Sequence, residues 1–163
     1  MTTPIKLNSL FIGAAGELLV QYQLLKHGID SARLTTDSGI DLVMYVPGSK
    51  EAHTIQVKAK YDAKPASAKK TPRIGVAFPD DCKAQWLAIA DVTRDLVWML
   101  RIETAREMAQ QKRPDGTRAL YWDSETTETK GVAYAETDLD PFRLTVVANS
   151  LIAGELPAVE GNT

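Results

Sequence analysis

The sequence has few of the residues that build disulfide frameworks, zinc sites and histidine-dependent hydrolases. Cys82 is the single cysteine, which excludes a disulfide framework and a cysteine-based zinc site. The two histidines, His27 and His53, are too few for a histidine-rich metal site or an ordinary Ser-His-Asp hydrolase. We expect His27 to end a helix and His53 to lie by a turn. One cysteine without a partner favours a reducing compartment, so we expect a cytoplasmic location.

Long apolar runs are also absent. No uninterrupted apolar stretch exceeds a few residues, which excludes a membrane-spanning helix. The first residues do not have the charged and then apolar pattern of a signal peptide. With 163 residues, 44% of them apolar, we expect a single domain over residues 1–152. Residues 153–163 are small, acidic and interrupted by Pro and Gly, and we expect them to form a flexible tail.

The charges are unevenly distributed, although the net charge of −2 gives no overall signal for nucleic acid. Residues 50–73 contain seven Lys or Arg against two acidic residues, a net charge of +5. Residues 121–163 contain eight Asp or Glu against two basic residues, a net charge of −6. The basic segment is suited to contacting phosphates, and a solvated lysine-rich loop is the alternative. The candidate nucleic-acid-binding residues are Lys60, Lys64, Lys69, Lys70 and Arg73.

The first regular element is a helix that begins after a cap at Asn8 or Ser9 and runs to about His27, with Gly28 as its stop. Apolar residues recur along it at steps of four, three, four and three, and this spacing predicts a stripe that faces the core. The stripe consists of Phe11, Ala15, Leu18, Tyr22 and Leu25.

Two glycines inside this helix, Gly13 and Gly16, predict the close approach of another backbone. Each costs about 1 kcal/mol relative to alanine in a helix interior, so their presence needs a packing reason. Glu17 stands between these glycines and the apolar stripe, with Gln21 one turn later on the same flank of the helix.

Extended segments follow the helix. We expect strands over residues 32–35, 40–46 and 54–59, the last two joined as a hairpin by the loop 47–52. Pro65 and Pro72 predict a loop over residues 62–73. The remaining elements are expected to be strands 86–91 and 96–102, a helix 103–112, and strands 119–122 and 142–148. The core should include Trp86, Trp98 and Trp122.

The hairpin gathers polar side chains on one face. Because side chains alternate along a strand, Ile40 shares a face with Leu42, and Asp41 lies on the other. On the second strand Gln56 and Lys58 share a face. If the hairpin closes symmetrically around its loop, Asp41 lies opposite Lys58, and its face also carries Gln56.

This grouping is suited to phosphodiester hydrolysis. A carboxylate and an amide oxygen are hard ligands that suit Mg²⁺, which keeps several of its waters. A nearby lysine can position the attacking water or stabilise the charge that develops on phosphorus. Glu17, from the helix beside the hairpin, can add a second carboxylate.

Three segments resemble the PD-(D/E)xK nuclease superfamily: Gly13-Ala14-Ala15-Gly16-Glu17, Ser38-Gly39-Ile40-Asp41-Leu42 and Ile55-Gln56-Val57-Lys58. Asp41 matches the first acidic position, Glu17 the helix glutamate, and the Gln56–Lys58 segment the (D/E)-x-K element. Gln56 stands where a carboxylate is usual, which resembles the branch that includes group I intron homing endonucleases. The match covers roughly residues 8–102.

The resemblance implies a restriction-endonuclease-like α/β fold, with a mixed β-sheet flanked by helices and the N-terminal helix packed on the active-site hairpin. It implies a Mg²⁺-dependent endonuclease, with Mn²⁺ as a substitute metal, that acts on double-stranded DNA as a dimer or tetramer. The implied catalytic residues are Glu17, Asp41, Gln56 and Lys58, the first three of them metal ligands.

Two alternatives stand beside the nuclease. Gln56 in place of a carboxylate favours a degenerate member that binds nucleic acid without cutting it. The acidic C-terminal third is the one feature that favours a protein-binding inhibitor.

Overall fold

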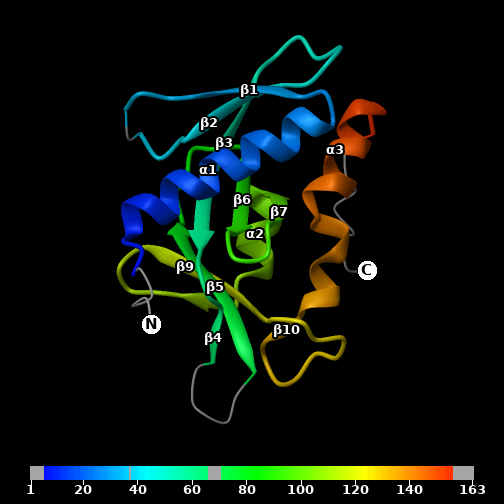
Figure 1. Ribbon diagram of the computed structural model, residues 1–163. Helices are drawn as coiled ribbons and strands as arrows, with labels where there is room; N and C mark the ends of the chain where they lie inside the picture. Colours follow the sequence, from blue (N-terminus) through cyan, green and yellow to red (C-terminus); the bar gives the residue numbers. More distant parts are fainter. Residues whose placement is uncertain (1–5, 37, 66–70, 156–163) are drawn as a thin grey trace, which may run out of the picture.

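The chain folds around two β-sheets that pack face to face, with helices on the outer side of the first sheet (Figure 1). The computed structural model describes residues 6–36, 38–65 and 71–155. The helices are α1 (Ser9–Lys26), α2 (Ile102–Met108), the 3₁₀ helix η1 (Glu136–Phe142) and α3 (Leu144–Ile152). The strands are β1 (Asp30–Arg33), β2 (Leu42–Tyr45), β3 (His53–Lys60), β4 (Lys64–Pro65), β5 (Pro72–Pro79), β6 (Trp86–Asp91), β7 (Leu96–Arg101), β8 (Gln111–Lys112), β9 (Thr117–Asp123) and β10 (Tyr134–Ala135).

The first sheet is mixed and has the strand order β1-β2-β3-β6-β7. Its central pair, β3 and β6, is parallel, and its other neighbours are antiparallel. The second sheet has the order β10-β9-β5-β4, with β8 also paired to β9. The predicted mixed α/β sheet, with the N-terminal helix packed on the β2–β3 hairpin, is therefore confirmed.

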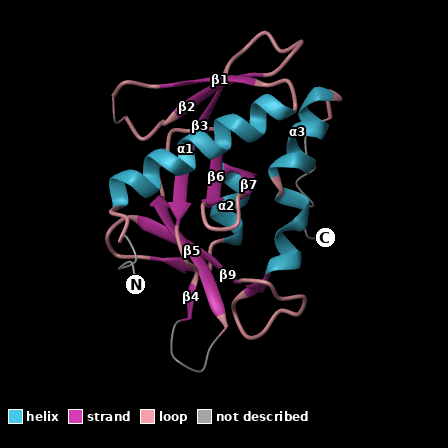
Figure 2. Cartoon of the chain, viewed as in Figure 1, coloured by secondary structure: helices cyan, strands magenta, loops and turns pink. Residues whose placement is uncertain are grey.

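Two hydrophobic cores lie on the two faces of the first sheet. On one face, α1 and α3 cover the sheet (Figure 2). Val20 and Leu24 of α1 and Val147 of α3 pack there in one core with Ile55 and Ala88. On the other face, the second sheet and α2 supply the cover. All three tryptophans are buried as predicted, Trp86 in the first core and Trp98 and Trp122 in the second. This second face of the first sheet is covered mainly by β5 and β9, with α2 beside them, whereas the sequence predicted helices flanking the sheet.

Local signals in the sequence place α1 as predicted. The Asn8 side chain caps the helix by accepting hydrogen bonds from the amides of residues 10 and 11, and His27 is the C-cap. Gly28 then takes a positive φ of 77°, which ends the helix without strain. A Cβ atom at Gly16 would collide with Ala59, so the expected close approach is confirmed there. At Gly13 it is wrong, because a Cβ atom would meet nothing within 4 Å.

The predicted core stripe of α1 is wrong. Phe11, Leu18, Tyr22 and Leu25 are each exposed by more than half, whereas the buried residues are Gly16, Val20 and Leu24. Both faces of this helix are apolar, so hydrophobicity alone did not select the buried face. The side with glycine allows the helix to approach the sheet closely, and that side is buried. In the described part of the chain, no helix is long and apolar enough to cross a membrane.

The C-terminal half departs further from the predictions. Residues 142–148 were expected to be a strand, but α3 begins at Leu144, because a short apolar run fits a buried helix as well as a strand. The expected loop 62–73 contains β4 and the start of β5. The expected helix 103–112 ends at Met108 and gives way to β8. The expected flexible tail lies, from residue 156 onward, outside the described residues.

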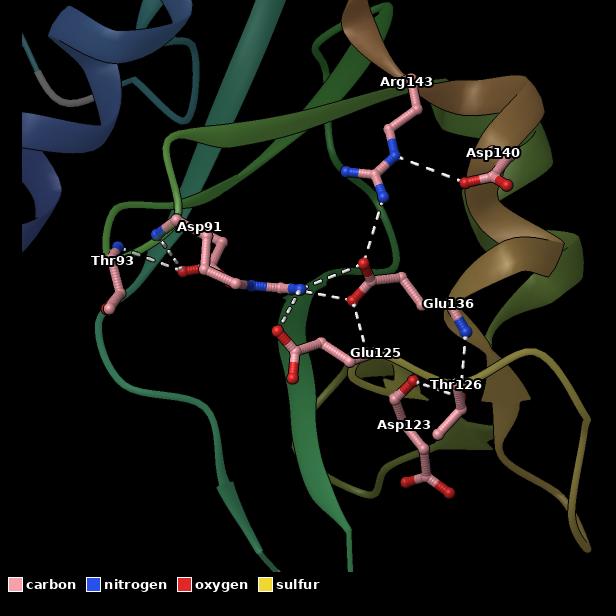
Figure 3. A network of polar contacts seen from close by, with 9 residues as sticks. Asp91, Thr93, Asp123, Glu125, Thr126, Glu136, Asp140 and Arg143 are labelled. Carbon is pink, nitrogen blue, oxygen red and sulfur yellow. Dashed lines mark hydrogen bonds and ion pairs between the residues drawn. The ribbon is translucent and has the colours of Figure 1, made fainter.

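An ion-pair network ties the β6–β7 turn to η1 (Figure 3). The Arg94 guanidinium contacts Asp91 at 2.6 Å and Glu136 at 2.8 Å, and Arg143 contacts Glu136 at 3.1 Å. Burial disfavours both charges, but the hydrogen bonds from Arg94 hold the pKa of Glu136 below its ordinary value. The bonds to Glu136 and Asp91 likewise raise the pKa of Arg94, despite its burial. The Glu136 carboxylate is therefore held in its charged form.

Candidate active site

The β2–β3 hairpin forms as predicted, but its register differs by two residues. Leu42 pairs with Ile55 and Val43 with Thr54, so the expected pairing of Asp41 with Lys58 is wrong. A shift of two residues preserves which side chains share a face. Ile40 precedes the strand and packs against the second core, so its predicted place beside Leu42 is also wrong.

Asp41 lies where β2 separates from β3. Its backbone amide donates to the carbonyl of Ile55 at 2.9 Å, which is the last backbone contact of the pair on this side. Its carboxylate Oδ2 accepts from the amide of Val57 at 2.6 Å. The Asp41 carboxylate thus accepts the hydrogen bond that a backbone carbonyl of a neighbouring strand would otherwise accept from β3. This bond fixes the carboxylate next to the Gln56–Lys58 segment, as the hypothesis of a site requires.

Gln56 is buried, with 6% of its surface exposed, on the face of β3 that meets the second core. Its Oε1 atom accepts from the thiol of Cys82 at 3.2 Å, and its parallel neighbour on β6 is Leu87. A carboxylate in this position would be costly, because it would be charged among apolar groups with only a weak thiol donor. The surroundings therefore explain why a neutral amide stands here.

Lys58 lines a cleft of about 690 Å³ between the start of α1, the second half of β3 and β5. Lys60 and Arg73 also line it. Within the described part of the chain, neither lysine has an acidic partner within 4.0 Å, whereas Arg73 pairs with Asp123 at 2.8 Å. The cleft therefore presents two cations without acidic partners and one that is already paired.

Two of the predicted phosphate-binding lysines, Lys69 and Lys70, lie outside the described residues. Lys64 lies in β4, where its backbone pairs with that of Arg73. The role of Lys64 in phosphate binding remains a prediction.

Glu17 forms an ion pair with Arg33 at 2.6 Å, and its side chain is 19% exposed. Arg33 belongs to β1, where it pairs with Leu42, and the next amide along, that of Leu34, donates to the carbonyl of Asp41 at 3.0 Å. Strand β1 thus connects Glu17 to the start of β2, directly after Asp41. The convergence of Glu17 with Asp41, Gln56 and Lys58 on one point remains a prediction.

Arg33 is a site residue that no pattern in the sequence indicates. Its relation to Glu17 depends on the pairing of β1 with β2, and no spacing in the sequence reveals that register. The guanidinium of Arg33 balances the negative charge of Glu17 when no metal ion is bound. A metal ion at Glu17 would therefore compete with Arg33 for the same oxygens.

The chemical types of the predicted donors, two carboxylates and an amide, suit a hard divalent cation. Within the described residues, no three His, Cys, Asp or Glu side chains are grouped as metal ligands. Two carboxylates and an amide oxygen are nevertheless enough for Mg²⁺, which commonly binds one or two carboxylates and retains water. The residues that would hold it are Asp41, Glu17 and Gln56.

Searches against protein-family models and curated protein sequences found no match. A search of solved structures found a bacterial homing endonuclease, I-Ssp6803I, with a TM-score of 0.62 and 14% identity over 90% of this chain and 93% of that chain. It also found the Holliday junction resolvase Hjc from Archaeoglobus fulgidus, with a TM-score of 0.49 and 13% identity over 88% of this chain and 97% of that chain. The first of these likenesses shows that the chain has the fold of that endonuclease, the restriction-endonuclease-like α/β fold that its resemblance to the PD-(D/E)xK superfamily predicts.

Proposed function

We propose that this protein is a metal-dependent endonuclease that hydrolyses phosphodiester bonds in DNA. The observation that carries the proposal is the carboxylate of Asp41, fixed on the amide of Val57 between Gln56 and Lys58. Lys58 itself faces a cleft that also presents Lys60. An acidic group and a lysine at one strand edge, in a nuclease-like fold, are the elements that phosphodiester hydrolysis needs.

Mg²⁺ is the proposed cofactor, and Mn²⁺ a substitute for it. When bound, such a cation would polarise the scissile phosphate and lower the pKa of a water molecule. Asp41, Glu17 and Gln56 are proposed to hold it. Asp41 is preorganised for this role, because its bond to Val57 fixes the carboxylate before any ligand arrives.

Lys58 is proposed to orient the attacking water or to stabilise the charge that builds on phosphorus. Its lack of an acidic partner in the described structure leaves its ammonium group available for an anion. The residues proposed to contact phosphates of double-stranded DNA are Lys60, Lys64, Lys69, Lys70 and Arg73. A homo-oligomer would bring two such sites to the two strands.

A second candidate is a protein that binds nucleic acid without cutting it. Two contacts favour it, since Gln56 is bonded to Cys82 and Glu17 to Arg33, so both proposed ligands already have partners. A purely structural role for these two side chains would leave the basic cleft intact.

Incubation with supercoiled plasmid in Mg²⁺, in Mn²⁺ and in chelator tests the proposal. Nicked or linear product with either metal, lost in chelator and in Lys58→Met, supports the nuclease. A matched control is Lys50→Met, which removes a lysine in the turn at the other end of β3. Metal-independent binding without cleavage by the wild type would favour the second candidate.

A further inference from the structure

One face of α1 is apolar and uncovered. Phe11 is 65% exposed, Leu18 58%, Tyr22 60% and Leu25 58%. These side chains project away from the sheet, because Gly16, Val20 and Leu24 on the opposite side of the helix are buried. The helix carries only two charged residues in its 18 positions, Glu17 and Lys26. A helix that is apolar on all sides is normally buried on all sides.

The exposed residues have the spacing of a helix–helix seam. Phe11, Leu18 and Leu25 are seven residues apart, and Ala15 and Tyr22 fill the intermediate positions of the same repeat. A strict seven-residue apolar repeat favours packing against another helix by knobs into holes. Within the described residues, the high exposure of these side chains shows that no helix of this chain occupies the seam.

We propose that this face of α1 is a homodimer interface, in which two copies of α1 pack antiparallel about a two-fold axis at Leu18. The sequence of the helix is self-complementary in this arrangement. Leu18 meets Leu18 of the partner subunit, and Phe11 meets Leu25 of the partner subunit. Ala14 lies one helical turn before Leu18 on the same face of α1. In this arrangement it is opposite Tyr22 of the partner subunit, so a small side chain on one helix faces a large one on the other.

The size of the face agrees with such a contact. An aromatic side chain offers about 150–250 Å² and a leucine somewhat less, so Leu10, Phe11, Leu18, Tyr22 and Leu25 together expose on the order of 500 Å². This is at the upper end of the apolar patches found on monomers. It is also most of the roughly 800 Å² per partner that a standard stable interface buries. A second copy is favoured over an unrelated partner because the seam matches itself and carries no charge pattern to specify another protein.

The interface is independent of the proposed chemistry. Its residues lie on the outer side of α1, whereas Ser9, Ile12 and Gly13 line the cleft. A variant that loses dimerisation can therefore retain metal binding, and an inactive Lys58→Met can retain the dimer.

A charge exchange at Leu18 tests the two-fold axis. Because Leu18 meets itself, Leu18→Glu and Leu18→Lys each place like charges together, and each should weaken dimerisation by at least about 100-fold. An equimolar mixture of the two variants should restore a one-to-one dimer. Sedimentation velocity measures the mass, and circular dichroism melts show that each variant is folded. The matched controls are Val132→Glu and Val132→Lys, which change a residue that is 72% exposed outside α1.

The register has a separate test. Phe11→Glu alone should dissociate the dimer, and adding Leu25→Lys in the same chain should restore it, since the two positions face each other across the axis. A wild type that stays monomeric at the highest accessible concentration would overturn the proposal. Folded Leu18 variants that keep the wild-type mass, or a mixture that does not reassemble, would also overturn it.

Discussion

The cleft and the Arg94 network use the same kinds of charged side chain in opposite ways. Lys58 and Lys60 reach the cleft without an acidic partner among the described residues, whereas Arg94 contacts Asp91 and Glu136 and is three-quarters buried. Paired charges join elements that are distant in the sequence, here the β6–β7 turn and η1. Unpaired cations gain nothing from the fold and remain available for an anion. The difference separates residues that stabilise the protein from residues proposed to act on a ligand.

The largest effect is expected for Arg94→Met. This change leaves Asp91 buried without its cation and leaves Glu136 with Arg143 alone. Removing one partner of a buried pair costs about 3–5 kcal/mol. The free energy of unfolding, from urea denaturation, measures it. Arg113→Met is the control, because Arg113 is exposed and has no acidic partner in the described part of the chain, and it should change stability by less than about 0.5 kcal/mol. Equal stability of the two variants would remove the distinction between network and cleft.

Lys58→Met should show the reverse pattern. Loss of one electrostatic contact in the transition state typically lowers the rate by about 10²–10³, so single-turnover cleavage should fall by that factor. The free energy of unfolding should not fall, since no ion pair is broken. DNA affinity should decrease much less than the rate, because other cations remain at the cleft. Cleavage at the wild-type rate under saturating protein would contradict the role of Lys58.

Glu136 makes the network sensitive to acid. Its pKa lies below the ordinary value of 4.5, so its contribution to stability is complete above pH 4.5 and is lost as the pH falls through the lowered pKa of the folded state. Glu136→Gln should cost on the order of 2 kcal/mol at pH 7, because charged hydrogen bonds are replaced. The difference from the wild type should shrink below pH 4.5 in a series of urea titrations. A constant difference down to pH 3 would show that the charge of Glu136 is not what stabilises the turn.

The sequence predicted the elements that depend on local signals. Asn8 and Gly28 marked the ends of α1, and the turn residues marked the β2–β3 hairpin, because caps and turns are encoded by neighbouring residues. The order and spacing of Glu17, Asp41 and the Gln56–Lys58 segment indicated the fold. That inference survived an error of two residues in the register, since an even shift keeps the same faces.

Features set by distant contacts could not be predicted in the same way. The pairing of β5 with β9, which builds the second sheet, joins segments about 45 residues apart. The contacts of Gln56 with Cys82 and of Glu17 with Arg33 also depend on the tertiary structure. Helix α1 has apolar residues on both its buried and its exposed side, so the spacing of apolar residues did not reveal which side meets the sheet. The stripe of Phe11, Leu18, Tyr22 and Leu25 is apolar but exposed in the single chain.

Substitutions of Gln56 separate a ligand from a packing residue. Gln56→Leu keeps the volume and removes the oxygen, so Mg²⁺ affinity measured by calorimetry should fall by about tenfold or more. Gln56→Glu places a charge at the ion and should bind Mg²⁺ more tightly, while lowering the stability of the metal-free protein because the site is buried. Metal affinity that is equal in the wild type and Gln56→Leu would show that Gln56 only packs beside Cys82.

The smallest effect compares two cations in the same cleft. Each phosphate contact that is lost should reduce the slope of log affinity against log salt by about 0.9. Lys60→Ala should produce that reduction, because Lys60 has no acidic partner in the described structure. Arg73→Ala should produce less, since its guanidinium is held by Asp123 at 2.8 Å and lies over the ring of Tyr121 at 4.9 Å. Binding measured at several salt concentrations in chelator, without cleavage, gives both slopes. An Arg73→Ala slope that falls as far as that of Lys60→Ala would mean that DNA displaces Asp123, and pairing in the free protein would then not predict which cations bind phosphate.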